Sequence, residues 1–320
     1  MWIFLLIPVI SSAFSFILAD ELVPKLREEG INGEDKHKAS GPKVPEMGGL
    51  VLVGGFVFGL LAVVGFNQFA DRLNVVDLNS LFAVGFTVLI VAIIGMVDDL
   101  LRIRQLTKAV LPFLASLPLM AIKAGKHSMS FPFLGQVKLG VFYPLLAVPF
   151  GITGASNAMN MLAGFNGLEV GLGVIIVSAL ALISWLIESW TAFFVLISLL
   201  GPLLVVLFYN WYPAELLIGD VGTLTIGAVV ASAVIVGDFE YAGVIIIIPF
   251  VADLVLKAMN GFPKSFAVHE DGKLYCPEDG PVGLAHLVLK LAGGLTEQSL
   301  VLVLLGIESV FAVLAVIYYL

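Results

Sequence analysis

The sequence contains one cysteine and few charged residues. Cys276 alone excludes a framework of intramolecular disulfides and a zinc site built from several cysteines. Only 12% of the 320 residues are charged, and the net charge of −8 argues against a nucleic-acid partner. The stretch before Asp20 has no basic residue and no evident cleavage site, so we expect a retained membrane span there rather than a signal peptide.

Hydrophobic side chains, by contrast, are abundant. They make up 60% of the residues, and the mean hydropathy of +1.07 is too high for a soluble core. Because a span needs about 20 apolar residues, the pattern predicts an all-α, polytopic membrane protein with about ten transmembrane helices. We expect one membrane domain over residues 1–320. The expected spans are 2–19, 48–66, 80–97, 109–124, 140–156, 168–187, 190–209, 223–237, 241–259 and 298–320.

Basic residues are unevenly distributed between the expected loops. Because successive spans alternate in direction, the loops after the odd-numbered spans emerge on one face. That face carries most lysines and arginines, whereas the other carries only Arg72, Lys123, Lys126 and Lys138. By the positive-inside bias, the face rich in basic residues is cytoplasmic and both termini lie outside. On the outer side, residues 125–139 predict a small β-ribbon.

A polar, glycine-bearing loop interrupts two apolar runs on the predicted cytoplasmic face. Asn157, Asn160 and Asn166 supply amide groups, which suit a hard cation and a flat hydrogen-bonding ring. Glycines such as Gly167 allow the backbone to approach a ligand closely. The alternative is a polar loop that only caps two helices.

Acidic residues mark two further helix ends on the same face. Asp98 and Asp99 are adjacent carboxylates, which repel each other unless a cation or a basic neighbour such as Lys108 offsets them. Asp220 lies in a Gly-Asp-x-Gly-Thr segment that ends at Thr223, just before a span. The pattern predicts a paired-acid site that holds phosphate through Mg²⁺. Solvated acids at one helix end and a simple N-cap at the other are the alternatives.

The first and last cytoplasmic loops hold other candidates. Residues 33–49, with two prolines and a glycine pair, predict an ordered extended strip, with a solvated linker as the alternative. Residues 260–296 form the longest polar segment, in which His286 lies among apolar neighbours. Asp253 and Glu308 are carboxylates within spans, and they are either functional or hydrogen-bonded between helices.

Taken together, these motifs resemble the polyprenyl-phosphate N-acetylhexosamine-1-phosphate transferases. The resemblance rests on Gly95-Met-Val-Asp98-Asp99, on Asn157-x-x-Asn160-x-x-x-Gly164-x-Asn166-Gly167-Leu168-Glu169, and on Asn210-Trp-Tyr-Pro213 with Gly219-Asp220. Bacterial relatives that load MurNAc-pentapeptide usually carry aspartate where this chain has Ala163. The segment therefore looks like the archaeal and eukaryotic branch, which uses dolichyl phosphate and UDP-GlcNAc.

The resemblance implies a role for each matching position. Asn160 and Asp220 would coordinate Mg²⁺, or Mn²⁺, beside the UDP pyrophosphate, and Asn166 would read the uracil. The expected catalytic residues are Asp98, Asp99 and Lys108. The expected substrate-binding residues are Lys38, Glu46, Asn157, Asn166, Gly167, Asn210, Lys264 and His286. The chain lacks the Arg-His-Arg cluster of eukaryotic members, and it keeps only His286 of the bacterial histidine cluster.

The implied reaction is a magnesium-assisted phosphoryl transfer. An oxygen of polyprenyl phosphate attacks the β-phosphorus of a UDP-N-acetylhexosamine, UMP leaves, and polyprenyl-diphospho-HexNAc remains, as in the first step of lipid-linked oligosaccharide assembly for N-glycosylation. We favour direct displacement, with the isoprenoid tail in an apolar groove along span 241–259. A phospho-MurNAc-pentapeptide-type or undecaprenyl-phosphate transferase is one alternative, and a lipid-linked sugar transporter is another. The expected location is the plasma membrane of an archaeon, or the ER membrane of a eukaryote, and a homodimer is left open.

Overall fold

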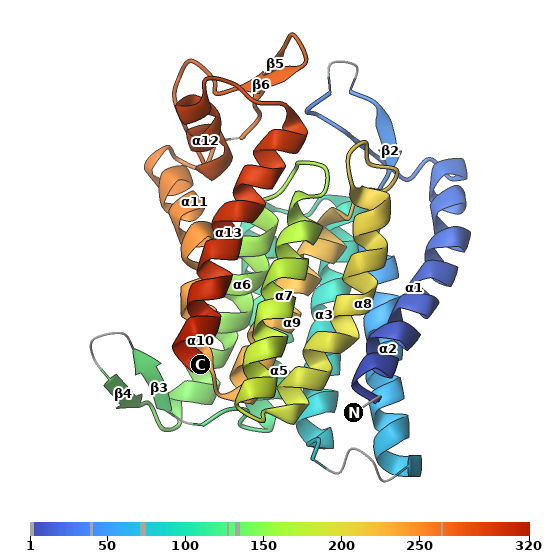
Figure 1. Ribbon diagram of the computed structural model, residues 1–320, viewed down its shortest axis with the longest axis vertical. Coiled ribbons are helices and arrows are strands. Elements are labelled where there is room, and N and C mark those ends of the chain that lie inside the picture. The colour runs from blue at the N-terminus through green and yellow to red at the C-terminus, as the bar shows by residue number, and fades with distance from the viewer. Residues whose placement is uncertain (1–2, 39–40, 71–74, 127, 132–134, 264) are drawn as a thin grey trace.

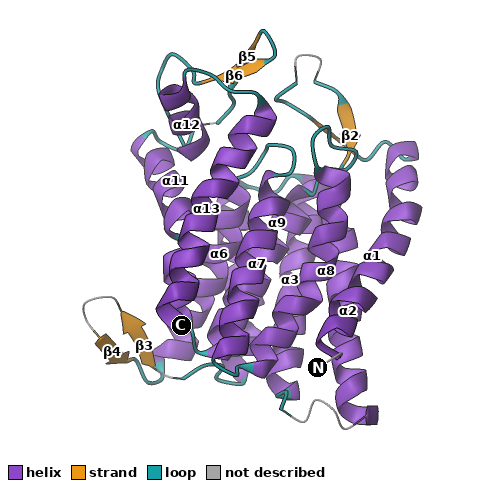
Figure 2. Ribbon diagram, in the orientation of Figure 1, coloured by secondary structure: helices purple, strands orange, loops and turns teal. Residues whose placement is uncertain are grey.

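The computed structural model describes residues 3–38, 41–70, 75–126, 128–131, 135–263 and 265–320. In this part of the chain, long helices run side by side in one bundle (Figure 1). Both termini lie at one end of the bundle. The strands β2, β5 and β6 lie at the opposite end, while β3 and β4 lie near the termini (Figure 2).

Helices make up most of the described chain. The long ones are α1 (Ile3–Glu28), α2 (Gly49–Ala70), α3 (Leu78–Leu101), α7 (Leu168–Leu186), α8 (Trp190–Asn210), α9 (Gly219–Gly237) and α13 (Glu297–Tyr319). The shorter ones are α4 (Gln105–Ala115), α5 (Leu117–Ala121), the π-helical turn η1 (Tyr143–Ala147), α6 (Val148–Met161), α10 (Glu240–Ile246), α11 (Ile248–Met259) and α12 (Leu284–Ala292).

The strands form three short antiparallel hairpins. They are β1 (Asn32–Glu34) with β2 (Lys43–Pro45), β3 (Ser128–Phe131) with β4 (Gly135–Lys138), and β5 (Val268–Glu270) with β6 (Lys273–Tyr275). The first hairpin confirms that the first loop is ordered, although the chain folds back there instead of forming one extended strip. The second hairpin confirms the expected β-ribbon.

Seven of the described helices are long and apolar enough to cross a bilayer, or up to eight if the bent pair α10–α11 counts as one span. The expected spans 109–124 and 140–156 fall on less regular segments. The first is divided into α4 and α5 at Pro118, and the second begins with η1, which contains Pro144. Proline removes a backbone donor and clashes with the preceding turn, which explains these breaks. The protein is therefore a polytopic, mostly helical membrane protein.

Helix α9 lies at the centre of the bundle and sets the position of the site. In the most apolar 18-residue stretch of α9, 83% of the residues are buried, whereas the corresponding share in α1 is 28%. A Cβ on Gly49 would lie 2.2 Å from the Gly222 backbone nitrogen, and one on Gly95 would lie 2.5 Å from the Cα of Val221. Glycine at these two positions therefore lets α2 and α3 pack closely against the start of α9.

The first loop is tied to the start of α9 by backbone pairing. The Gly48 and Gly49 N–H groups donate to the carbonyls of Leu217 and Ile218, each at 2.8 Å, and the Leu217 N–H donates to Pro45 at 2.8 Å. These bonds hold the loop over the end of the bundle that carries the polar motifs.

Candidate active site

Four helices bring polar side chains together around Lys108. The ammonium, on α4, lies 2.8 Å from an oxygen of Asp98 at the end of α3. It also donates a hydrogen bond to Asp220 in the first turn of α9. Lys108 is only 6% exposed, so this charge has little access to water. The two acidic motifs, far apart in the chain, thus share one buried cation.

Asn160, at the end of α6, completes this group. With its amide oxygen facing Lys108, that oxygen accepts from the ammonium at 2.9 Å. Its nitrogen then donates to Asp220 at 2.8 Å and to the Thr223 hydroxyl at 3.0 Å. In this orientation every partner of the amide is chemically matched. All three N–H donors of Lys108 are then used by acceptors of the protein itself.

Asp99 faces a different way from Asp98. Its two carboxylate oxygens accept hydrogen bonds from the backbone N–H groups of Asp220 at 2.8 Å and Val221 at 3.0 Å. It therefore anchors the N-terminus of α9, where free N–H groups favour a negative charge. Gly219 has a φ of +68°, and a Cβ there would lie 2.6 Å from an Asp99 oxygen. In this structure Asp99 positions the Asp220 turn, while Asp98 contacts Lys108.

A second polar group surrounds Asn166. Its side-chain oxygen accepts from Lys38 at 3.1 Å and from the Ala214 N–H at 2.9 Å, and its side-chain nitrogen donates to Asp35 at 3.1 Å. The Asn166 backbone N–H donates to Glu297 at 2.8 Å, and Lys38 donates to the same carboxylate. Lys38 also lies 3.4 Å from Asp35. The amide that would read a base is thus held firmly in one orientation.

Asn210, at the end of α8, holds the loop around Asn166 through hydrogen bonds to the backbone. The Asn210 side-chain oxygen accepts from the Gly167 N–H at 3.1 Å, and its nitrogen donates to the Leu216 carbonyl at 2.9 Å. Glu169 accepts from the Gly164 N–H at 2.5 Å. Asn210 is 2% exposed, so its contribution is to shape the loop.

A polar cavity of about 440 Å³ connects the two groups. Asn160, Asp220 and Thr223 line one part of it, and Asn166 lines another. The rest of its wall comes from the first loop, including Glu46, and from the end of α11 with the segment after it. A cavity of this size fits a small organic ligand with several polar contacts.

The first loop contributes a neutral histidine to this cavity. His37 stacks on Phe165 with ring centroids 4.2 Å apart and an interplanar angle of 16°. Burial lowers the pKa of His37 to about 4, and this outweighs the opposing effect of Asp35. The imidazole is therefore uncharged at neutral pH. Burial raises the pKa of Glu46, another cavity residue of this loop.

Of the expected substrate-binding residues, Glu46, Asn166 and Asn210 line this cavity, and Lys38 and Gly167 lie beside it in the group around Asn166. The other three lie elsewhere or outside the described chain. The Asn157 side-chain nitrogen donates to the carbonyls of Ala109 at 3.0 Å and Thr153 at 2.8 Å, which ties α6 to α4. His286 is buried on α12 and lines a small adjoining cavity, which shares Lys257 with the polar cavity. Lys264 is outside the described residues.

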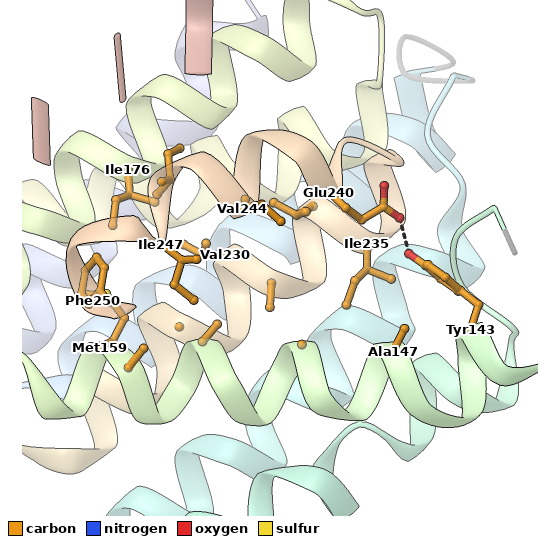
Figure 3. Close-up of a pocket in the computed structure, with 18 residues that line it drawn as sticks. Tyr143, Ala147, Met159, Ile176, Val230, Ile235, Glu240, Val244, Ile247 and Phe250 are labelled. Carbon is orange, nitrogen blue, oxygen red and sulfur yellow. Dashed lines mark hydrogen bonds between the residues drawn. The ribbon is translucent and has the colours of Figure 1, made fainter. Parts of the chain in front are cut away.

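An apolar groove begins at Met159, the residue before Asn160 on α6. It has a volume of about 180 Å³ and lies between α6, α9 and the bent pair α10–α11 (Figure 3). Its inner part includes Met159, which precedes Asn160, and Gly227, which lies one helical turn beyond Thr223. At the other end the Tyr143 hydroxyl donates to Glu240 (Figure 3). Along α6 the groove extends from Met159 to Ala147, about 18 Å at 1.5 Å per residue.

The sequence is similar to those of known proteins over the segments that form this site. The model of glycosyl transferase family 4 matches residues 81–238, which contain Asp98, Lys108, Asn160 and Asp220. A relative from Saccharolobus solfataricus is 36% identical over 98% of this chain and 96% of its own length. The chain belongs to glycosyl transferase family 4. This confirms the resemblance seen in the motifs.

The names of family 4 relatives point to related reactions. The Saccharolobus protein is named, provisionally, a UDP-N-acetylglucosamine–dolichyl-phosphate N-acetylglucosaminephosphotransferase. A Dictyostelium discoideum protein of that name is 28% identical over 92% of this chain and 85% of its own length. A phospho-N-acetylmuramoyl-pentapeptide-transferase from Borreliella burgdorferi is 29% identical, over 74% of this chain and 77% of its own.

The oxygen atoms of this family 4 site suit a small hard cation. Among the described residues, no three His, Cys, Asp or Glu side chains form a metal-binding group. Mg²⁺ needs fewer protein ligands, because it is bound through one or two carboxylates together with substrate phosphates. Asp220 and Asn160 offer oxygens at one point, where Lys108 now supplies the positive charge. The donor set therefore fits Mg²⁺.

Several residues of the site were missed in the sequence. Asp35, His37, Glu297 and Lys257 all lie at or beside the cavity, yet none belongs to a motif with metal-ligand or catalytic spacing. Lys38 and Glu297, for example, are separated by 259 positions. A weak signal for Glu297 exists, because an acidic residue directly after Thr296 is typical of a helix start.

Proposed function

We propose that the protein transfers GlcNAc-1-phosphate from UDP-GlcNAc to dolichyl or a related polyprenyl phosphate and releases UMP. One observation carries the proposal: a polar cavity large enough for a nucleotide is lined by Asn160 and Asp220, which contact Lys108, and an apolar groove reaches Met159, the residue before Asn160. A reaction between a water-soluble donor and a lipid phosphate needs this combination. The names of the relatives support the same donor and acceptor.

The residues of the site suit direct displacement by the lipid phosphate. Asp220 and Asn160 would hold Mg²⁺, which would supply charge neutralisation at the diphosphate and the leaving UMP. Asp98 would keep Lys108 in place, and the donors that Lys108 now gives to Asp220 and Asn160 would turn to the acceptor phosphate when those two residues hold Mg²⁺. A phosphate monoester has a second pKa of about 6 and is mostly a dianion at pH 7, so no strong general base is required. The tail of the acceptor would lie in the groove of Figure 3.

We further propose ten membrane crossings with the cavity on the cytoplasmic side. Counting α4–α5 and η1–α6 as crossings places both termini on one face, as the bundle has them (Figure 1). The basic residues of the loops favour the opposite, cavity-bearing face as cytoplasmic.

Cys276, the single cysteine, offers a direct test of this orientation. It lies after β6 at the cavity end of the bundle and is partly exposed. We expect a membrane-impermeant maleimide to label it in inside-out vesicles and not in intact cells. Labelling in intact cells alone would contradict the proposed orientation.

The donor and the metal requirement can be tested with purified protein. With one lipid phosphate, we expect UDP-GlcNAc to react faster than UDP-GalNAc or UDP-MurNAc-pentapeptide. EDTA should abolish turnover, and Mg²⁺ should restore it. A preference for the pentapeptide donor would favour the alternative transferase. A protein that never exchanges labelled UMP into UDP-GlcNAc, with Mg²⁺ and lipid phosphate present, would instead fit a transporter.

A further inference from the structure

Three lysines lie around the polar cavity, Lys108 and Lys257 buried and Lys38 half-buried, and they differ in how many of their N–H donors the protein already uses. An ammonium has three donors. Lys108 contacts Asp98, Asp220 and Asn160, as described above. Lys38 likewise contacts Asp35, Asn166 and Glu297. Both ammonium groups are therefore fully engaged.

Lys257 has one donor left. Its ammonium lies 2.8 Å from Asp253 and donates to the carbonyl of Met161. Among the described residues the structure records no third acceptor, although Lys257 is only 9% exposed and lines the cavity. A buried N–H that faces a polar cavity without an acceptor is costly unless a ligand or water accepts from it.

The position of Lys257 indicates which part of a ligand it meets. Met161, which accepts its hydrogen bond, directly follows Asn160, so the ammonium lies beside the end of α6 that carries the proposed metal ligand. Asp253, one helical turn earlier on α11, pairs with the ammonium, and its carboxylate also accepts a hydrogen bond from the Leu284 N–H at 2.8 Å. The charge is thus held in place rather than free to move with a long side chain.

We propose that Lys257 binds the β-phosphate of the nucleotide donor, the phosphate at which displacement occurs. This inference rests on the proposed function and adds a residue to it. The cavity is lined by several carboxylates, among them Asp35, Glu46 and Asp220, so a fixed ammonium in its wall offsets part of their repulsion of a diphosphate.

A purely structural role is the competing interpretation. The ammonium near the last carbonyls of α6 also complements the negative end of that helix dipole. Removal of such a cap would disturb Asn160 and would weaken the binding of every nucleotide to the same extent. The two roles therefore differ in whether the loss depends on the β-phosphate.

Equilibrium binding of UDP and UMP to the purified full-length protein, with Mg²⁺ present, separates these roles. UMP lacks the β-phosphate. Lys257→Met should therefore lower the affinity for UDP by about tenfold to a hundredfold and change the affinity for UMP by less than about twofold. Lys257→Arg keeps the charge and should restore part of the UDP affinity. Thermal unfolding in the same detergent reports whether each variant is folded.

Lys36→Met is the matched control. Lys36 lines the same cavity but is exposed, and its ammonium lies over the Phe266 ring at 4.8 Å. Its loss removes the same charge, and the UDP-to-UMP affinity ratio should stay near the wild-type value. An equal loss of UDP and UMP in Lys257→Met, or no loss of either, overturns the inference. A wild-type protein that binds neither nucleotide contradicts the proposed function itself.

Discussion

Asp220→Asn should turn over about 10³ times more slowly than the wild type, because it removes the proposed metal's carboxylate ligand and keeps the shape of the side chain. Asp220 is the acceptor that Lys108 and Asn160 share, and no second carboxylate of the described site contacts both. The loss should appear in kcat at saturating donor and lipid phosphate. The Mg²⁺ concentration for half-maximal rate should also rise.

Asp238→Asn is the matched control for this variant. Asp238 lies at the opposite end of the same helix, α9, where it accepts from the Lys126 backbone N–H. It undergoes the same chemical change far from the cavity, so its kcat should stay within about twofold of wild type. Near-wild-type turnover of Asp220→Asn, or an equal loss in Asp238→Asn, would refute this assignment of Asp220.

The second large effect is expected for Lys108→Met. This change leaves Asp98 and Asp220 beside each other without their shared buried cation, and one member of a buried charge group is costly to remove. We expect kcat/KM for the lipid phosphate to fall by about 10²-fold or more. Lys108→Arg should recover only part of this loss, because the planar guanidinium has a different geometry.

Lys126→Met is the control for losing a lysine charge at the surface, away from the site. Lys126 pairs with Asp238 at 3.8 Å on the far side of the bundle, and its side chain is 78% exposed. Exposed ion pairs contribute little, so this variant should keep its activity. If Lys108→Met retained wild-type kcat/KM while its fold was intact, Lys108 would have no part in the reaction.

Much of the site could be predicted because helix direction constrains where loops emerge. Spans alternate, so the ends of α3, α6 and α8 share one face, and each end carries a polar motif. That Asp98, Asn160 and Asp220 lie on one face follows from this pattern. An ordered first loop was also predictable, since prolines and glycines restrict the backbone there, but its folding into a hairpin was not.

The partners of Asn166 could not be predicted in this way. Asp35, Lys38 and Glu297 come from loop and helix ends whose meeting depends on tertiary packing, and no local spacing encodes it. The sequence also could not distinguish the contacts of Asp99 from those of Asp98, because the two neighbours have identical side chains. Only the close approach of α3 to α9 assigns one carboxylate to Lys108 and the other to the backbone.

The irregular spans show a second limit of the sequence. Hydropathy measures how apolar a segment is and carries little information about where a helix bends. Helices α10 and α11, bent by 52° relative to each other, line one side of the apolar groove, and Tyr143 and Ala147 of η1 line one end of it. A groove for a lipid tail and an ordinary lipid-facing surface have the same composition, so only the arrangement of the helices distinguishes them.

The nucleotide released in a single reaction tests the central claim most directly. With purified protein, UDP-GlcNAc, Mg²⁺ and polyprenyl phosphate, attack at the β-phosphorus yields UMP and polyprenyl-diphospho-GlcNAc in equal amounts. Attack at the sugar carbon would instead yield UDP and polyprenyl-phospho-GlcNAc. Equimolar UMP and the diphosphate product are the predicted result, and release of UDP, or of no nucleotide, would contradict the account.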